Sequence, residues 1–328
     1  MTITRRNSPK TKAYLPAALS HESLLGKSRI HAQRAVTAKS DGLDDDYQLY
    51  ASLALELLAK ASLAAIHPSL VVEPENANSL LEACGISTGT VVRSIKAQDA
   101  YARLKHTVKH FGTPAYEDCR KLAERRNAEL HSGEAAFSTM PPPAWEGSFW
   151  NSAELMLDSF KLSLDEWLGV DATTPKQVLK AMRAAKKDAA KERIKHATDG
   201  FKKRPDGQKR GKAEIEKLRE ASKGINPLDS RSQFHYLLSN YWLGECPACK
   251  CSGVLGGDPT FEEPADDQSD ADDGFEIVER GFNPVEFHCP TCGLVLVGEE
   301  ALTEAELSDE YIETEEREIE YGPEYGND

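Results

Sequence analysis

Two Cys-x-x-Cys pairs place the strongest constraint on how this chain of 328 residues can fold. Each pair forms a knuckle that presents two thiolates, and two knuckles complete a tetrahedral site of the kind that zinc prefers. The ligands that this spacing predicts are Cys246, Cys249, Cys289 and Cys292. Four protein ligands leave no open position on the metal, so we expect a structural Zn²⁺. The pattern leaves open whether Cys251 or His288 joins the site.

The residues around these pairs predict a small β-rich domain. Short β-prone stretches, Ser252–Leu255 and Leu294–Val297, each follow one pair. Between the pairs lies an acidic insert, residues 258–273, that is too polar to pack into a core. The whole region, residues 233–300, is similar to a zinc ribbon, a module that commonly mediates contacts with nucleic acid or protein.

Charge is distributed unevenly along the chain, which has a formal net charge of −14. Residues 258–328 contain 24 acidic and 2 basic residues, whereas the remainder contains 38 Lys and Arg against 30 Asp and Glu. A basic body with an acidic tail is compatible with a protein that binds a polyanion and shields its own basic surface. The alternative is that the tail, residues 301–328, only keeps the protein soluble. Within it we expect a helix over residues 303–319.

The first half of the chain predicts a mainly α fold. Apolar residues recur at three- and four-residue spacing over residues 43–66, and His67-Pro68 ends that helix. Further helices are expected over residues 76–84, 98–111, 114–132 and 145–168. Residues 43–169 therefore predict a bundle of four or five helices. The preceding residues 1–42 are expected to form an N-terminal extension that is disordered at first and helical over residues 21–39.

A basic helical connector, residues 170–232, follows the predicted bundle. Residues 176–223 hold 17 Lys and Arg against 7 Asp and Glu, and Arg204-Pro-Asp-Gly207 predicts a turn between two helices. Such helices can bind the phosphate backbone of RNA or DNA. The alternative is a solvated connector between two folded parts. The candidate nucleic-acid-binding residues are Lys186, Lys187, Lys202, Lys203, Arg204, Lys209 and Arg210.

One helix of the bundle ends in a cluster of three functional groups. Its apolar stripe consists of Cys119, Leu122, Ala123 and Leu130. Arg126 falls inside this stripe, whereas Arg125 points away from it and is expected to be solvated. Asn127 and His131, four residues apart, lie together on the flank of the stripe. A guanidinium, an amide and an imidazole at the end of one helix predict a phosphate-binding site.

Arg126-Asn127-x-x-x-His131 in an all-helical bundle resembles the signature of the HEPN superfamily (higher eukaryotes and prokaryotes nucleotide-binding). That signature is an Arg, a polar residue and, after a few positions, a His. The long helix with Glu56-x-x-x-Lys60 and its His67-Pro68 ending is also like many HEPN domains. The resemblance covers about residues 43–169 and implies metal-independent cleavage of RNA by attack of the ribose 2′-OH on the adjacent phosphate.

The resemblance also implies roles for individual residues. His131 would act as general base or acid, because an imidazole can do either near neutral pH. Arg126 would stabilise the charge that develops on the phosphate oxygens. Asn127 would orient His131 or the substrate. The auxiliary residues that would line the same cleft are Glu56, Lys60, Tyr116 and Arg120.

HEPN ribonucleases usually form homodimers in which two such motifs face each other. Arg126 on the apolar stripe agrees with this arrangement, because a dimer interface would cover it. The architecture resembles toxin–antitoxin and antiviral-defence effectors, which implies RNA as substrate and an antitoxin or other regulatory protein as partner. The alternative function is a non-catalytic adaptor that dimerises through the bundle and contacts nucleic acid or protein through the ribbon.

The predicted location is the cytoplasm, without a membrane. The N-terminus lacks the apolar core of a signal peptide, and Glu56 and Lys60 interrupt the longest apolar segment. The spacing of the cysteines indicates metal ligands rather than disulfides, which fits a reducing compartment.

Overall fold

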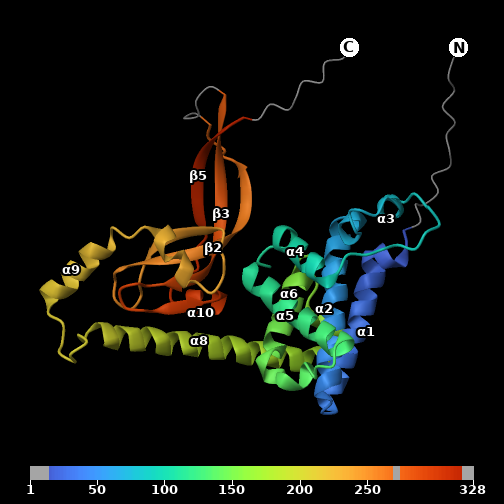
Figure 1. Ribbon diagram of the computed structural model, residues 1–328, viewed down its shortest axis with the longest axis horizontal. Coiled ribbons are helices and arrows are strands. Elements are labelled where there is room, and N and C mark those ends of the chain that lie inside the picture. Colours follow the sequence, from blue (N-terminus) through green and yellow to red (C-terminus); the bar gives the residue numbers. More distant parts are fainter. Residues whose placement is uncertain (1–14, 269–273, 320–328) are drawn as a thin grey trace. The chain divides into compact units, whose positions relative to one another are not determined.

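The computed structural model describes residues 15–268 and 274–319 (Figure 1). The start of the expected N-terminal extension, the tip of the acidic insert and the end of the acidic tail lie outside the described residues. The chain divides into two units: the first comprises residues up to Phe111 and Ala115–Lys180, and the second comprises Gly112–Pro114 and the residues from Ala181 onward. The first unit is helical and the second holds a small antiparallel sheet, in agreement with the expected mainly α fold with a β-rich C-terminal region.

The first unit is built from helices joined by short 3-10 turns. Its α-helices are α1 (His21–Ser40), α2 (Asp44–Ile66), α3 (Ala77–Ala83), α4 (Ala97–Thr107), α5 (Thr113–His131), α6 (Glu146–Asp158), α7 (Leu164–Leu168) and the start of α8 (Thr173–Phe201). Its 3-10 turns are η1 (Ala17–Leu19), η2 (Pro68–Val71), η3 (Phe137–Thr139), η4 (Pro142–Ala144) and η5 (Gly169–Ala172).

Small residues allow α1 and α2 to pack closely along their length. Ala32 and Ala35 of α1 are fully buried, as are Ala51 and Ala54 of α2. Alanine side chains let two helix axes approach each other, which increases the dispersion contacts between the backbones. The helical bundle therefore begins at α1, inside the stretch that the sequence suggested as an extension.

Helix α2 is the central helix of the first unit. By length and composition alone it could cross a membrane, despite Glu56 and Lys60, but 61% of its apolar window is buried inside the structure, as in the core helix of a folded domain. Leu55 and Leu58 are completely buried, together with Trp150 of α6. The indole Nε1 of Trp150 donates to the Tyr47 hydroxyl at 3.2 Å, so this buried donor is satisfied.

The single helix expected over residues 145–168 is in fact two helices. Helix α6 ends at Asp158, and Lys161 adopts a positive φ of 59°, which a continuing α-helix does not allow. A capping box then starts α7, in which Ser163 and Glu166 satisfy each other's backbone N–H groups. The Ser-x-x-Glu pattern was the sequence signal for this break.

The second unit combines a five-stranded antiparallel sheet with helices. The strands are β1 (Asn240–Glu245), β2 (Ser252–Pro264), β3 (Phe275–His288), β4 (Val295–Val297) and β5 (Tyr311–Glu318), and the helices are the rest of α8, α9 (Lys212–Ser222), η6 (Pro227–Gln233) and α10 (Glu299–Glu304). The order is β1-β2-β3-β4, and β5 pairs with the other end of the long β3. Helix α8 packs on the sheet through small and apolar side chains, including Ala190, Ala197 and Phe201.

Two predictions for the acidic C-terminal region were wrong. Residues 258–264 of the acidic insert belong to β2 and pair with β3, so this part of the insert is ordered sheet. Residues 311–318, expected within a helix, form β5. Pairing with β3 decides the conformation, because a full ladder of hydrogen bonds outweighs a weaker local preference for helix.

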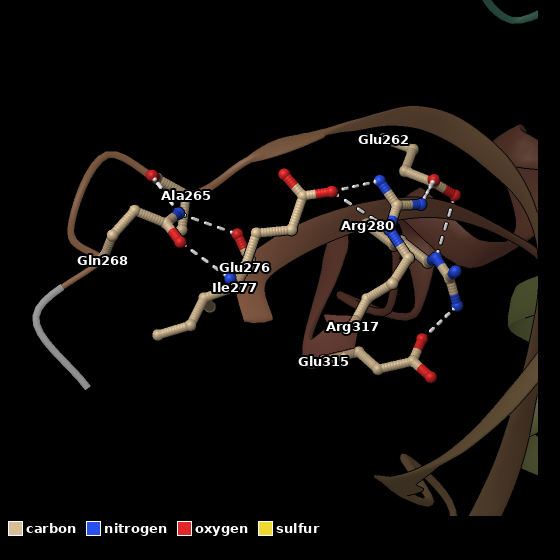
Figure 2. Close-up of polar contacts among 8 residues, drawn as sticks. All are labelled: Glu262, Ala265, Gln268, Glu276, Ile277, Arg280, Glu315 and Arg317. Carbon is tan, nitrogen blue, oxygen red and sulfur yellow. Dashed lines mark hydrogen bonds and ion pairs between the residues drawn. The ribbon is translucent and has the colours of Figure 1, made fainter. Parts of the chain in front are cut away.

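The two basic residues of the acidic C-terminal stretch hold its strands together (Figure 2). Arg280 of β3 contacts Glu262 of β2 at 2.9 Å and also pairs with Glu315 of β5. Arg317 of β5 contacts Glu262 at 2.6 Å and Glu276 at 2.8 Å. Each arginine thus lies between carboxylates that would otherwise repel one another across neighbouring strands.

Candidate functional site

Arg126 of α5 forms an ion pair with Glu56 of α2 in the first unit. As the apolar stripe indicated, Arg126 is largely buried, with 12% of its side chain exposed. The same carboxylate accepts from the Nζ of Lys60 at 2.7 Å, and Lys60 also donates to the Ser94 hydroxyl at 3.2 Å. Two cations thus share one carboxylate, so the largely buried side chains of this cluster, Arg126, Lys60 and Glu56, together carry one net positive charge.

The cluster keeps its carboxylate ionised. Burial by itself would raise the pKa of Glu56, but Lys60 and the hydrogen bond from Arg126 outweigh that effect and lower it. Tyr101 of α4 is fully buried near the cluster, and its burial, reinforced by the negative charge of Glu56, raises the pKa of the phenol well above its ordinary value. Tyr101 therefore stays neutral, and the ionised groups are Glu56, Lys60 and Arg126.

Asn127 and His131 are both exposed on the same flank of α5, and Asn127 contacts the cluster. The side-chain oxygen of Asn127 accepts from Nε and Nη2 of Arg126 at 3.3 and 3.0 Å. Within the described residues no hydrogen bond joins Asn127 to His131, so in this structure the amide orients the guanidinium rather than the imidazole. His131 is the last residue of α5, about 7 Å along the helix axis from Arg126.

Arg125 is not solvated, which corrects the sequence-based expectation. Its guanidinium donates to the backbone carbonyl oxygens of Ala136 and Phe137 and, at 3.2 Å, to the Thr139 hydroxyl. One turn further along α5, the carboxylate of Glu129 accepts from the backbone N–H of Phe137 at 3.0 Å. Arg125 and Glu129 together hold the loop that follows His131 against α5. Their i,i+4 spacing was the only sequence signal for this role.

Tyr116 and Arg120 share the helical face of Asn127 and His131 but lie two to four turns earlier on α5. Arg120 pairs with Glu117 at 2.7 Å and with Glu124 on the same helix. Tyr116 lies under the Nζ of Lys105, 5.6 Å from its ring centre. The structure therefore brings Glu56, Lys60, Arg126 and Asn127 into contact, whereas Tyr116 and Arg120 contact other residues.

The four predicted cysteine ligands come together in the second unit. The Sγ atoms of Cys246, Cys249, Cys289 and Cys292 all lie within 4.8 Å of one another. Two cross-knuckle pairs, Cys246 with Cys292 and Cys249 with Cys289, are separated by 3.6 Å. A tetrahedral ion bound at about 2.3 Å would set its sulfur ligands nearly 3.8 Å apart, so this arrangement fits a metal site and a zinc ribbon.

The thiols lie close enough to alter one another's acidity. Hydrogen bonds from Cys249, Cys289 and Cys292 lower the pKa of Cys246, because they stabilise its thiolate. Cys251 is buried in the neighbouring core, and its Sγ lies 4.0 Å from the carbonyl oxygen of Cys249. Neither Cys251 nor His288 belongs to the cluster, so among the described residues the metal site consists of the four cysteines of the two pairs.

Several of the candidate nucleic-acid-binding residues are engaged within the chain. Arg204 and Arg210 both pair with Glu214 of α9, at 2.6 and 3.4 Å, and close the turn between α8 and α9. Lys202 lies 3.7 Å from Asp199. The remaining candidates are exposed on α8 or on the turn after it: Lys187, Lys203 and Lys209.

Part of the acidic C-terminal region lies against the basic helix α8. Glu300 of α10 contacts Lys186 at 3.2 Å and Arg183 at 3.8 Å, and Glu304 lies 3.8 Å from Lys191. The uneven charge along the sequence therefore corresponds to contacts within one unit, which lower the positive charge that α8 presents to solvent.

Comparison of the chain with known proteins finds no match: no protein-family model, no curated protein and no solved structure is similar to it.

Proposed function

We propose that the first unit binds and cleaves RNA without a metal ion, with Arg126 and His131 as the catalytic residues. The observation that carries this proposal is the pairing of two cations, Arg126 and Lys60, with one carboxylate, on a helix that also exposes Asn127 and His131. A phosphate is the anion that such a cluster suits, because a guanidinium can donate two parallel hydrogen bonds to it.

The proposed reaction needs one proton acceptor and one proton donor. A base removes the proton of the ribose 2′-OH, the oxygen attacks the adjacent phosphorus, and the bond to the 5′-oxygen breaks as that oxygen takes up a proton. The products are a 2′,3′-cyclic phosphate and a 5′-hydroxyl. His131 would serve as base or acid, and Arg126, held by Glu56 and Asn127, would stabilise the charge on the phosphate oxygens.

One copy supplies one imidazole at this position, so we propose that two copies act as a homodimer in which the second His131 completes the acid–base pair. The ion pair with Glu56 already accounts for the burial of Arg126, so the buried arginine does not itself require a dimer. The dimer proposal is tested by the mass of the particle in solution scattering at micromolar protein; a monomer that still cleaves RNA would contradict it.

The decisive experiment incubates the purified full-length chain with a labelled RNA and a metal chelator. We expect cleavage that ends in a 2′,3′-cyclic phosphate, and no cleavage of the same strand with 2′-deoxyribose at the cut site. His131→Ala should lower the rate by about 100-fold or more. The matched control is His106→Ala, which removes another exposed imidazole from the same unit and should cleave at the wild-type rate.

Equal rates for His131→Ala and the wild type would reject the catalytic proposal. The function favoured in that case is a non-catalytic adaptor, in which the Arg126–Glu56 pair only ties α5 to α2. By analogy with HEPN ribonucleases, the proposed setting is cytoplasmic, as a toxin or antiviral-defence effector under the control of a regulatory protein.

We further propose that the four cysteines hold a structural Zn²⁺. Their thiolate donors suit zinc, and four of them leave no site for a substrate. The ion would join the loop before β2 to the loop before β4 and so fix the sheet that they flank.

A further inference from the structure

An open groove of about 1030 Å³ lies between α8 and the β4 edge of the sheet, wholly within the second unit. Val295 and Val297 of β4 line it, whereas the intervening Leu296 is buried in the core. Ala189 and Ala190 line the α8 side. The groove thus has an apolar floor that small side chains leave open.

The rim of this groove is cationic. Lys186, Arg193 and His196 recur along one side of α8 at intervals of seven and three residues, so they face the same groove. Glu192 is the one acidic residue of the lining. Lys186 shares its charge with Glu300, as described above, so Arg193 is the strongest candidate for contact with an anion.

A buried carboxylate orients a second imidazole at the same groove. Glu286 of β3 is completely buried, yet it accepts from the backbone N–H of His235 at 3.0 Å and from its Nδ1 at 2.8 Å. The His235 side chain is itself 65% exposed and lines the groove. Because a carboxylate only accepts, Nδ1 carries the proton and Nε2 is the nitrogen presented to a ligand.

The burial of Glu286 needs an explanation beyond packing. A buried carboxylate is costly unless it is hydrogen-bonded, and an apolar residue in β3 would avoid that cost. Among the described residues, the side-chain hydrogen bonds of Glu286 all come from His235, whose ring is exposed. The fold therefore places a buried charge where its effect is to fix the orientation of a surface imidazole.

We propose that this groove binds a single-stranded segment of RNA, next to the metal knuckle and separate from Arg126 and His131. The ligand class rests on the proposed function, whereas the site rests on the groove itself. Arg193 and His235 would contact phosphate and ribose, and an unpaired base would pack on the Tyr236 ring and the two valines. A duplex offers only its backbone to such a floor and should bind more weakly.

The test measures the affinity of the metal-loaded, full-length chain for a fluorescent single-stranded RNA by anisotropy. All proteins carry His131→Ala so that the RNA probe stays intact. The binding result can therefore be interpreted whether or not the wild type cleaves RNA. Arg193→Glu should weaken binding by about tenfold. The matched control is Lys195→Glu, the same charge change on an exposed residue of α8 outside the groove lining, with an effect of about twofold or less.

His235 is tested with two variants, because His235→Ala leaves Glu286 without its partner and can destabilise the sheet. His235→Asn keeps an N–H donor at the position of Nδ1 and removes the distal part of the ring with Nε2, so it should fold normally and still weaken binding by about fivefold. Equal losses of RNA affinity in Arg193→Glu and Lys195→Glu would show that only the overall charge of the protein matters, and would overturn the proposal. So would displacement of the RNA by an acidic peptide or by duplex RNA at equal concentration.

Discussion

Arg126 and Glu56 are 70 residues apart in sequence and form an ion pair that joins α5 to α2. This ion pair has one structural and one catalytic consequence. It satisfies a buried guanidinium, which is a structural role, and it fixes the plane of that guanidinium beside Asn127, which is what a catalytic arginine requires.

Glu56→Gln should destabilise the first unit. The substitution leaves Arg126 and Lys60 as neighbouring, mostly buried cations without a counter-charge. We expect a loss of about 2 kcal/mol in the free energy of unfolding, at the low end for a broken buried pair because the site is partly exposed. Urea denaturation followed by circular dichroism measures it. Glu124→Gln, which breaks an exposed pair with Arg120, should change stability by less than about 0.5 kcal/mol.

The stability that Glu56 contributes should depend on pH with a definite sign. Its pKa is lowered in the folded state from an ordinary value of 4.5, so its contribution is complete above that pH and is lost as the pH falls through the lower, folded value. The difference in unfolding free energy between the wild type and Glu56→Gln should therefore shrink below pH 4.5. Any loss of metal from the ribbon at acid pH would occur in the wild type and in Glu56→Gln alike, so it cancels in the difference between them. A difference that stays constant at acid pH would show that Glu56 is not charged in the fold.

Arg126→Lys should separate structure from catalysis. A lysine can keep the charge pair with Glu56 but cannot offer two parallel donors to a phosphate. We expect the cleavage rate to fall by about 100-fold while the melting temperature stays within a few degrees of the wild type. Rates and melting curves from the same preparation provide the comparison. A variant that cleaves normally would limit Arg126 to the interhelical ion pair.

Cys289→Ser should release the metal, whereas Cys251→Ser should retain it. The first removes one of the four clustered Sγ atoms, and the second removes a buried thiol outside the cluster. Elemental analysis of protein purified under reducing conditions should find about one zinc per chain in the wild type and in Cys251→Ser. Metal loss in both variants would mean that Cys251 is a ligand. A fully folded, metal-free wild type would refute the structural role of the ion.

Arg125→Ala should loosen the loop after α5 without moving the helices. The substitution removes the donors that hold the carbonyl groups of Ala136 and Phe137. Because those carbonyls can turn to water, we expect a modest loss of about 1 kcal/mol. Hydrogen exchange over residues 134–140 should become faster, while exchange in α2 stays unchanged. A global increase in exchange would indicate that Arg125 supports the core as well.

The helices and the metal ligands could be predicted from the sequence because their signals are local. The apolar period over residues 43–66 predicts α2, and two Cys-x-x-Cys pairs predict which thiols meet. The helical wheel placed Arg126 on the buried face of α5 correctly, but it could not show that Glu56 would meet it. That contact depends on the packing of two helices, and a single sequence carries no record of it.

The parts that could not be predicted depend on partners that are distant in sequence. Residues 311–318 have enough glutamates for a helix, and only the free edge of β3 makes them a strand. Arg125 looked solvated because its partners are backbone carbonyls, which every residue has and which no motif marks. Glu286 and His235 lie 51 residues apart, and neither stands in a recognisable pattern.

Strand β5 limits how two copies of this chain can associate. It pairs with β3 on one side, and among the described residues no strand is paired with its other edge, where an approaching strand could add to the sheet. Five of its eight residues are charged, four of them glutamates. A second β5 would bring the same negative charges opposite these, and the repulsion would exceed what a few interchain hydrogen bonds return. Two copies of the chain therefore cannot associate by pairing their β5 strands, and a dimer has to use another surface.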